Sequence, residues 1–558
     1  MPKMTGARLL AETVHGYGLT HVFYMPFIAP RALAEMQNLG MSLVQAHSEK
    51  AAAYMADGYA RTRRGPGLCM SQSVGALNLA AGLQDAYLAK SPVIAITGRE
   101  IQASAGRNPY QEVDHVNPFR AVAKSSAYVP EPALLAQHLC NAFRTAVSGA
   151  PGPAHLDIEG RTGGPTTLVE AEITVSIDPA FSHFPPFRPV ADRQSIEAAL
   201  KLLNDAKRPI IVAGGGVTAS NARAELIALA EKLSIPVATA LNAKAMFPTA
   251  HPLAVGTPGS YSRASANQLV CEADIVFYIG SHTGSQVTNY YQVPPSNTPI
   301  IQLDIDAGEI GRNYPAKVGL HGDAKATLNA MLEKAEPTAT RQQWLARVRE
   351  LVEKWKAENE PLFTADVIPM RPERLCREIE NNLPANAILV SDTGHSGIWT
   401  GAYIDLKSDE QTYLRCAGSL GWGFPASLGA KCAAPDRPVV CFTGDGGFWY
   451  HLAELDTARK YGIHTVTVVN NNHSLNQEKT HNESSIRGVS DNAEQFWLFP
   501  ETDFAKIAES MGCIGIVVKN PDDFSAALKE ALSAAKPVVL DVRTHIDGIA
   551  PGGWSPVR

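Results

Sequence analysis

The sequence predicts an α/β protein built from three doubly wound parallel-sheet domains. Short apolar runs rich in Val and Ile alternate with helical stretches along the whole chain, which is the pattern of β–α–β units. The 558 residues exceed what a single core supports, because domains typically hold about 100–150 residues. The runs fall into three blocks of similar size and texture, so we expect three versions of one architecture.

Changes in composition separate the three blocks. A loose stretch rich in Gly, Pro and Phe follows the first block, and the charged helical stretch 336–370 precedes the third. Both are typical of connectors. The expected units are a first domain over 1–165, a central domain over 190–335, a third domain over 371–545, and a Gly- and Pro-rich tail or lid over 546–558.

Composition excludes several classes of protein. Lys and Arg total 49 against 55 Asp and Glu, for a net charge of −6, so the chain offers no basic field for nucleic acid. No apolar run approaches the length of a membrane span, and the N-terminus lacks the apolar core of a signal peptide. The eight cysteines form no CxxC pair, which argues against metal clusters and a disulfide framework. We therefore expect a cytoplasmic protein without membrane or nucleic-acid partners.

Potential ligands for a metal and a phosphate follow two neighbouring strands of the third block. The apolar run 437–443 leads into Gly444, Asp445, Gly446 and Gly447, and the next run leads into Asn470–Asn472. Because the carboxyl ends of adjacent parallel strands share one sheet edge, Asp445 and the asparagines should lie close together. Carboxylate and amide oxygens suit Mg²⁺ held jointly with a phosphate, and the glycines expose N–H groups to phosphate oxygens. Either motif alone is usually a turn, so the prediction depends on their combination.

The spacing of this pair, with Asn472 lying 27 residues after Asp445, resembles the thiamine diphosphate (ThDP) motif. Further segments extend the likeness to the acetolactate synthase/pyruvate oxidase-like group of ThDP enzymes over nearly the whole chain. These segments are AHSEKAAAYMADGYAR, PYQEVDHVNPF, KRPIIVAGGGV, SDTGHSGIW and AGSLGWGFPASLGAK, in the family's order. The resemblance implies ThDP and Mg²⁺ as cofactors, and a homodimer or homotetramer whose active sites lie between subunits.

The resemblance also implies roles for particular residues. Glu49 matches the glutamate that exchanges a proton with the aminopyrimidine ring of the cofactor, and its neighbours from Ala51 to Met55 are apolar, which suits that exchange. Glu49, Gln111 and Phe27 are the expected catalytic and pocket residues. Besides Glu49, the expected cofactor contacts are Asn78, Gly394, His395, Ser396, Gly418, Leu420, Gly444, Asp445, Gly446, Gly447, Asn472, Ser474 and Leu475, with Asp445, Asn472 and Ser474 also binding the metal.

Three departures from the family pattern bear on substrate and cofactor. Phe27 stands where a small residue is usual, so its ring should reshape the space beside the thiazolium. The segment 476–479 (NQEK) is polar where acetolactate synthases carry an apolar and aromatic run, which favours a hydrophilic substrate. The segment GSHTGSQVT lacks the arginine of flavin-binding relatives, which makes FAD the less favoured alternative for the central domain.

The favoured function is a carboligase acting on 2-keto acids or 2-hydroxy ketones. Alternatives within the class are a lyase or hydrolase of diketones, acyloins or 2-hydroxyacyl thioesters, and an acyltransferase that uses phosphate. From another class, Gly214–Gly216 suggests a dinucleotide-binding protein, although the third fingerprint glycine is missing. A binding protein that has lost catalysis is disfavoured, because Glu49, Asp445 and Asn472 are retained.

Overall fold

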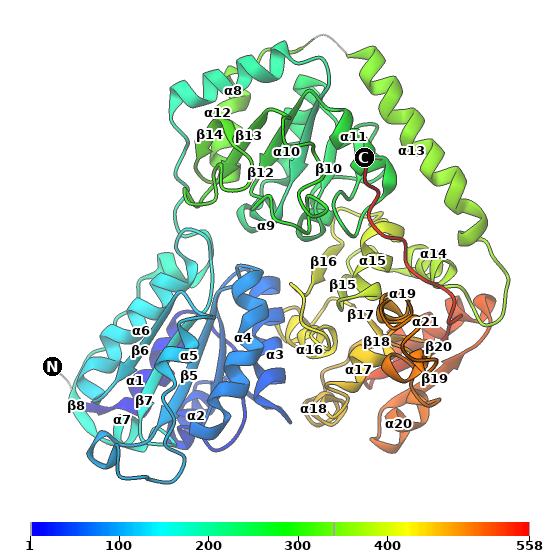
Figure 1. Ribbon diagram of the computed structural model, residues 1–558. Helices are drawn as coiled ribbons and strands as arrows, with labels where there is room; N and C mark the ends of the chain where they lie inside the picture. Colours follow the sequence, from blue (N-terminus) through cyan, green and yellow to red (C-terminus); the bar gives the residue numbers. More distant parts are fainter. Residues whose placement is uncertain (1–2, 339–340, 557–558) are drawn as a thin grey trace.

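The structure is a computed structural model that describes residues 3–338 and 341–556. Within these residues the chain forms three six-stranded parallel sheets, each flanked by helices (Figure 1). This confirms the predicted α/β class. In the same residues, no helix is both long enough and apolar enough to span a membrane.

The N-terminal sheet has the strand order β3-β2-β4-β5-β7-β6. Residues 68–70 and 93–96, in two of its inner strands, are buried and apolar on both faces, as expected where helices cover a parallel sheet. Its strands are β2 (His21–Tyr24), β3 (Ser42–Gln45), β4 (Gly67–Ser71), β5 (Val93–Arg99), β6 (Ser125–Val129) and β7 (Ala154–Glu159), and a separate antiparallel ribbon pairs β1 (Lys3–Thr5) with β8 (Glu170–Glu172). The helices are α1 (Gly6–Gly16), α2 (Pro30–Asn38), α3 (Glu49–Arg63), α4 (Ala76–Leu88), α5 (Val116–Phe119), α6 (Pro132–Val147) and α7 (Gly164–Leu168).

The C-terminal sheet, ordered β16-β15-β17-β18-β20-β19, repeats the connectivity of the N-terminal sheet strand for strand. Its strands are β15 (Ile388–Ser391), β16 (Thr412–Arg415), β17 (Val439–Gly444), β18 (Val466–Asn471), β19 (Ile514–Val518) and β20 (Val538–Arg543). The helices are α14 (Pro372–Asn382), α15 (His395–Ile398) with a π-helical turn (Trp399–Tyr403), α16 (Gly423–Ala433), α17 (Asp445–Trp449), α18 (Glu454–Tyr461), α19 (Asn476–Ser485), α20 (Phe504–Ser510) and α21 (Phe524–Ser533).

The central sheet differs from the other two, because its order is β11-β10-β9-β12-β13-β14. This is the strand order of dinucleotide-binding folds, so the expectation of three versions of one architecture is correct for only two of the domains. Its strands are β9 (Pro209–Ala213), β10 (Val237–Thr239), β11 (Ala254–Gly256), β12 (Ile275–Ile279), β13 (Ile300–Asp304) and β14 (Ala316–His321); its helices are α8 (Arg193–Asp205), α9 (Gly215–Ser220), α10 (Arg223–Leu233), α11 (Ala264–Glu272) and α12 (Ala324–Lys334).

Two helical features hold the three domains together. Helix α13 (Gln342–Phe363) connects the central and C-terminal domains (Figure 1) and buries Trp344, Val348, Leu351 and Trp355, which share one face at helical spacing. Helices α3 and α16 bring the N- and C-terminal domains into backbone contact. A Cβ atom on Gly58 would lie 2.1 Å from the Ala426 carbonyl oxygen, and one on Gly429 would lie 1.8 Å from that of Met55.

Candidate functional site

The predicted site residues follow the first four strands of both repeated sheets. In the N-terminal domain, Phe27, Glu49, Asn78 and Gln111 follow β2, β3, β4 and β5. In the C-terminal domain, the groups at 394–396, 418–420, 444–447 and 472–475 follow β15, β16, β17 and β18. Open parallel sheets bind ligands at this edge, so the two domains offer two matching halves of one kind of site.

Asp445 is the centre of the C-terminal half. It is the first residue of α17 and is 2% exposed, and its carboxylate accepts hydrogen bonds from the Gly446 N–H at 2.7 Å and the Ser474 N–H at 3.1 Å. Burial raises the pKa of Asp445 to about 6, although these backbone N–H groups lower it. The Ser474 bond joins the β17 and β18 loops, as the spacing of the motif predicts.

The three asparagines at the carboxyl end of β18 have different hydrogen-bond partners. The side-chain Oδ1 of Asn470 accepts a hydrogen bond from the Thr544 hydroxyl at 2.6 Å, and the side-chain amide of Asn471 donates to Asp541 at 2.7 Å. Asn472 is also buried, but no hydrogen bond found among the described residues involves its side chain. Asn472 is therefore the member of the run that remains available to a ligand beside Asp445, together with the buried Ser474.

The turn at Gly394 adjoins this centre. Gly394 has a left-handed φ of 64°, and a Cβ atom there would lie 2.7 Å from Oε1 of Gln477. Ser396 is buried, with its hydroxyl close to Gly444. Burial lowers the pKa of His395 to about 4, so its ring is neutral near neutral pH. The turn thus offers a neutral imidazole, a hydroxyl and backbone N–H groups beside Asp445.

Two buried carboxylates that the sequence analysis did not select hold the turn that carries Gly418 and Leu420. Asp392, directly after β15, accepts from the Gly421 N–H at 3.0 Å and the Gly423 N–H at 2.8 Å. Asp85, in α4 of the N-terminal domain, accepts from Ala417, Gly418 and Ser419. The position of Asp392 at a strand end is a signal that sequence reasoning could have used, whereas Asp85 lies inside a helical pattern without any such signal.

The N-terminal half of the site is centred on Glu49. Ser48 caps α3 by accepting from the Ala51 N–H at 3.1 Å, which places Glu49 as the first helical residue. A Cβ atom on Gly75 would lie 2.3 Å from Oε1 of Glu49, and the Asn78 amide donates to Oε2 at 3.4 Å. The Gln111 carbonyl accepts from the Ser73 hydroxyl at 2.6 Å. Glu49, Asn78 and Gln111 therefore surround one short turn, Ser73–Gly75.

Of the residues that depart from the family pattern, only some lie at the site. Phe27 is 56% exposed at the N-terminal half of the site. The side chain of Gln477 lies next to Gly394. Asn476 and Lys479 have other partners: the Asn476 amide donates to the Ile546 and Gly548 carbonyls, and Lys479 forms an ion pair with Asp547 at 2.8 Å. These two side chains anchor the start of the C-terminal tail instead of facing a substrate.

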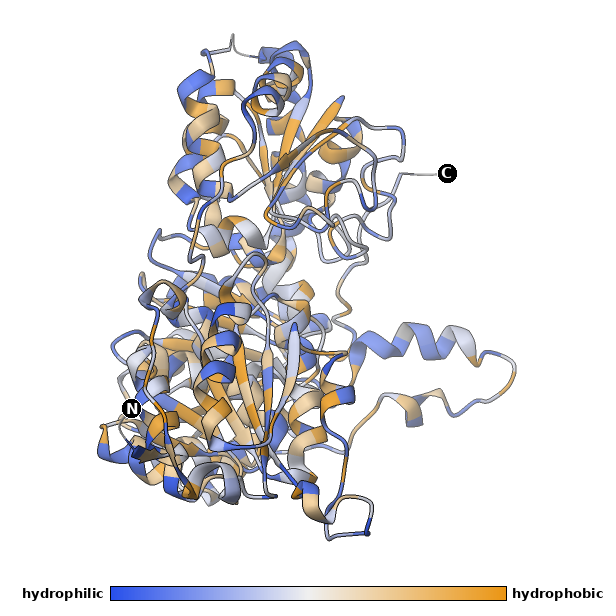
Figure 2. Cartoon of the chain, turned by 90° about the vertical axis from the view of Figure 1, so that its left-hand side faces the viewer, coloured by the Kyte–Doolittle hydropathy of each residue, from blue (hydrophilic) through white to orange (hydrophobic). Residues whose placement is uncertain are grey.

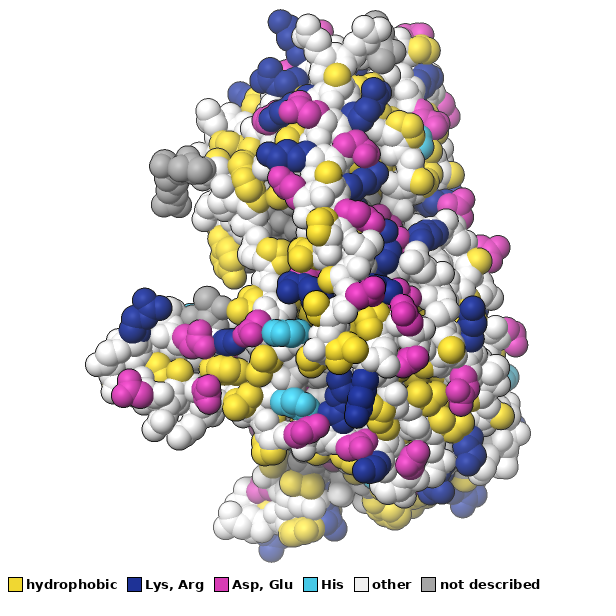
Figure 3. Space-filling view, turned by 90° about the vertical axis from the view of Figure 1, so that its right-hand side faces the viewer, with side chains coloured by type: hydrophobic (Ala, Val, Ile, Leu, Met, Phe, Trp, Pro, Cys, Tyr) yellow, Lys and Arg dark blue, Asp and Glu magenta, His cyan; other side chains and the backbone are white. Residues whose placement is uncertain are grey.

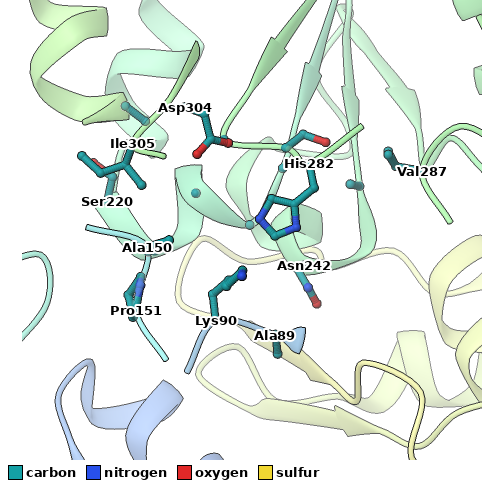
Figure 4. A pocket seen from close by; sticks show the side chains of 18 of the residues that line it. Ala89, Lys90, Ala150, Pro151, Ser220, Asn242, His282, Val287, Asp304 and Ile305 are labelled. Atoms are coloured by element: carbon teal, nitrogen blue, oxygen red, sulfur yellow. The ribbon is translucent and has the colours of Figure 1, made fainter. Parts of the chain in front are cut away.

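A separate cavity lies at the carboxyl edge of the central sheet. It has a volume of about 360 Å³ and is lined by residues of all three domains, including Gly214–Gly216, His282 and Asp304 of the central domain, Lys90 of the N-terminal domain and Arg415 of the C-terminal domain. Figure 4 shows Lys90 and His282 extending into it from different domains. It occupies the place where folds with this strand order bind nucleotides.

Comparisons with known proteins agree with the fold. Family models match residues 4–117 (thiamine pyrophosphate enzyme, N-terminal TPP binding domain), 196–331 (central domain) and 392–542 (C-terminal TPP binding domain). The chain is 33% identical to a probable acetolactate synthase large subunit of Methanocaldococcus jannaschii, over 99% of this chain and 94% of that protein. It is 29% identical to the acetolactate synthase large subunit of Haemophilus influenzae, over 97% of this chain and 94% of that protein.

Fold, site and comparisons together define a ThDP-dependent enzyme. Within that class, the chain belongs to the acetolactate synthase-like family of thiamine pyrophosphate enzymes. The predicted family resemblance and the predicted class of enzyme are therefore confirmed.

Proposed function

We propose that this enzyme cleaves and forms carbon–carbon bonds next to the carbonyl of 2-keto acids or 2-hydroxy ketones, with ThDP held through Mg²⁺. The observation that carries the proposal is that Asp445 and Asn472 are both buried at the carboxyl ends of two adjacent strands. The side chain of Asn472 has no hydrogen bond among the described residues, so it is free to bind a ligand. When bound, ThDP supplies a nucleophilic carbon that adds to a carbonyl and stabilises the charge left when the adjacent bond breaks. The protein supplies orientation, charge and proton transfer.

The donor set suits Mg²⁺ shared with a diphosphate. Asp445 provides one buried carboxylate, and Asn472 and Ser474 provide neutral oxygens. The described residues contain no group of three or more His, Cys, Asp or Glu side chains arranged to hold a metal by themselves. Mg²⁺ usually retains several non-protein ligands and is completed by phosphate oxygens, so a site with one charged side chain fits this ion.

Glu49 is proposed to exchange a proton with the aminopyrimidine ring. Its carboxylate lies over Gly75 without an intervening side chain, and Asn78 orients one of its oxygens. The Gln111 carbonyl is tied down through Ser73, whereas Oε1 of the Gln111 side chain is buried without a partner in the described part of the chain. We propose that this oxygen accepts a hydrogen bond from the substrate.

A second copy of the chain is proposed to complete the site. Large apolar side chains lie exposed after three strands of the N-terminal sheet, on the sheet edge that also carries Glu49: Phe27, Val74, Leu77 and Tyr110. The segment containing α19 projects from the body of the C-terminal domain (Figures 2 and 3), and it exposes Val489, Phe496 and Leu498. Exposed apolar patches of this kind mark interaction surfaces. A homodimer, or a homotetramer formed from two dimers, would cover both surfaces and place Glu49 of one copy against Asp445 of the other.

The polar side chain of Gln477 supports a hydrophilic donor or acceptor. Gln477 also influences Tyr261 of the central domain: burial, the largest effect, raises the pKa of that phenol, and the Gln477 side chain lowers it by less. A site built to hydrogen-bond a hydroxyl or carbonyl rejects substrates that lack it. This observation keeps cleavage of acyloins or 2-hydroxyacyl compounds as the second candidate.

A substrate panel tests the proposal. Keto acids and hydroxy ketones are assayed with the wild type, Phe27→Gly and Gln477→Met. We expect Phe27→Gly to widen the range of donors and Gln477→Met to weaken the preference for polar partners. If pyruvate-to-acetolactate conversion is the best reaction and neither change alters the ranking, the enzyme is an ordinary acetolactate synthase.

The cavity of the central domain is proposed to take a nucleotide other than FAD. Its strand order and its volume, within the roughly 300–1,000 Å³ of small-molecule sites, support a nucleotide. The GSHTGSQVT segment, which includes His282, stands where the family resemblance places the flavin-binding arginine. Mass spectrometry and a visible spectrum of the purified enzyme test this, because bound flavin would give a yellow protein.

The eight free cysteines, several of them buried, support a reducing compartment such as the cytoplasm.

A further inference from the structure

The turn from Ala417 to Gly421 is held by two carboxylates that come from different domains. Asp85 of the N-terminal domain accepts from the N–H groups of Ala417 at 2.8 Å, Gly418 at 3.2 Å and Ser419 at 3.0 Å. Asp392 of the C-terminal domain accepts from Gly421 at 3.0 Å. The backbone donors of the turn therefore point inward, toward these two side chains.

Asp85 belongs to a buried cluster in which the negative charges outnumber the positive ones. Asp85 and Asp57 are both 0% exposed, and they share one cation, Arg61. Arg61 is closer to Asp57, at 2.6 Å, than to Asp85, at 3.3 Å. A buried carboxylate without its own cation is costly unless hydrogen bonds satisfy it. The three N–H groups of the turn are the donors that satisfy Asp85.

We propose that Asp85 is a positioning residue for the cofactor: it fixes the Gly418–Leu420 turn against which the aminopyrimidine ring of ThDP packs. This inference rests on the proposed function, which assigns Gly418 and Leu420 to that ring. Three bonds from one rigid helix, α4, fix the turn more tightly than solvent-exposed bonds would, because the carboxylate is buried and its hydrogen bonds are charge-assisted. Asp85 itself does not face the site, so it acts through the backbone of the turn.

The test compares Asp85→Asn with a matched control, Asp57→Asn. Both changes remove one buried negative charge beside Arg61, and both leave Arg61 paired with the remaining carboxylate, so both chains should fold. Only Asp85→Asn places an NH₂ group against N–H donors of the turn. In the apoprotein we expect hydrogen exchange of the amides at 417–419 to accelerate by about tenfold or more in Asp85→Asn, and to remain near the wild-type rate in Asp57→Asn.

Cofactor binding separates positioning from a general structural role. Calorimetry is carried out in Mg²⁺ with two probes, ThDP and inorganic pyrophosphate, which engages only the diphosphate end of the site. Asp85→Asn should bind ThDP about tenfold more weakly and pyrophosphate as the wild type does, whereas Asp85→Glu, which keeps the charge, should recover part of the loss. General destabilisation would weaken both probes.

Three outcomes decide the inference. Unchanged exchange at 417–419, or equal weakening of both probes in Asp85→Asn, overturns it. If Asp85→Asn does not fold, the exchange rates in Asp85→Glu decide: we expect the turn to be at least partly protected there, and full loss of protection despite the retained charge overturns the inference. Failure of the wild type to bind ThDP contradicts the proposed function instead.

Discussion

Among the proposed site residues, Glu49 is the one whose chemistry can be tested most directly. It lies over Gly75 and is oriented by Asn78. Glu49→Gln keeps the shape and the Asn78 contact but cannot exchange a proton, so we expect activity to fall by at least about 10²-fold while ThDP still binds. Steady-state kinetics and calorimetry measure the two effects. Near-normal turnover in this variant would show that another group performs the proton transfer.

Asp445 is expected to determine whether the cofactor stays bound. Asp445→Ala removes the proposed charged metal ligand, so the purified protein should contain little ThDP or Mg²⁺. Asn472→Ala should weaken binding less, because it removes a neutral ligand, and Asn470→Ala serves as the control, since Asn470 bonds Thr544. Metal analysis and ThDP titration give the order of affinities. Unchanged ThDP affinity in Asp445→Ala would place the metal elsewhere.

Two of the buried carboxylates make the stability of the apoprotein depend on pH. Burial raises the pKa of both Asp392 and Asp445 from 3.8 to about 6, so their protonated forms favour the folded state. The two protonated carboxyl groups contribute their full stabilisation when the pH is below the ordinary aspartate pKa. This stabilisation is lost as the pH rises through the pKa of the folded state. The apoprotein should therefore show a falling thermal midpoint between about pH 4 and pH 6, and Asp445→Asn should reduce the slope. An identical slope in this variant would contradict the assignment to Asp445.

At the scale of elements, the crossing of α3 and α16 joins the two repeated domains. A Cβ atom on Gly429 would overlap the Met55 carbonyl at 1.8 Å, and backbone cannot move aside as a flexible side chain can. Gly429→Ala should therefore force the helices apart, at a cost of about 2 kcal/mol. We expect the thermal midpoint to fall by about 5 °C. Gly552→Ala, where no atom lies within 4 Å, is the control and should change the midpoint little.

The elements themselves were predictable where a local signal existed. Buried parallel strands are continuous apolar runs, so the run 437–443 contains most of β17 (Val439–Gly444). Asp445 and Asn472 could be selected from the sequence because each follows such a run. Strand order could not be predicted from the sequence, since it depends on the direction in which each crossover helix carries the chain along the sheet. The role of Asp85 could not be predicted either, because it depends on a turn that lies 332 residues further along the chain. The separate tasks of Asn470, Asn471 and Asn472 likewise depend on distant partners.

At the scale of the whole molecule, we expect two copies of the chain to associate. Val74 and Leu77 are 55% and 44% exposed beside the Glu49 turn, and the proposed dimer buries them. In a symmetric dimer each substitution occurs twice in the interface. An aspartate buried there costs about 2 kcal/mol per copy, so Leu77→Asp should weaken dimerisation by about 10³-fold. Activity should then rise with protein concentration.

Light scattering after size-exclusion chromatography measures this association. We expect a dimer or tetramer for the wild type and smaller species for Val74→Asp and Leu77→Asp at micromolar concentration. Val190→Asp is the matched control, because Val190 is 52% exposed at the start of the central domain, and this variant should assemble and turn over normally. A wild-type chain that is fully active as a monomer would contradict the proposed site between subunits, since Glu49 and Asp445 of one copy would then have to serve the same cofactor.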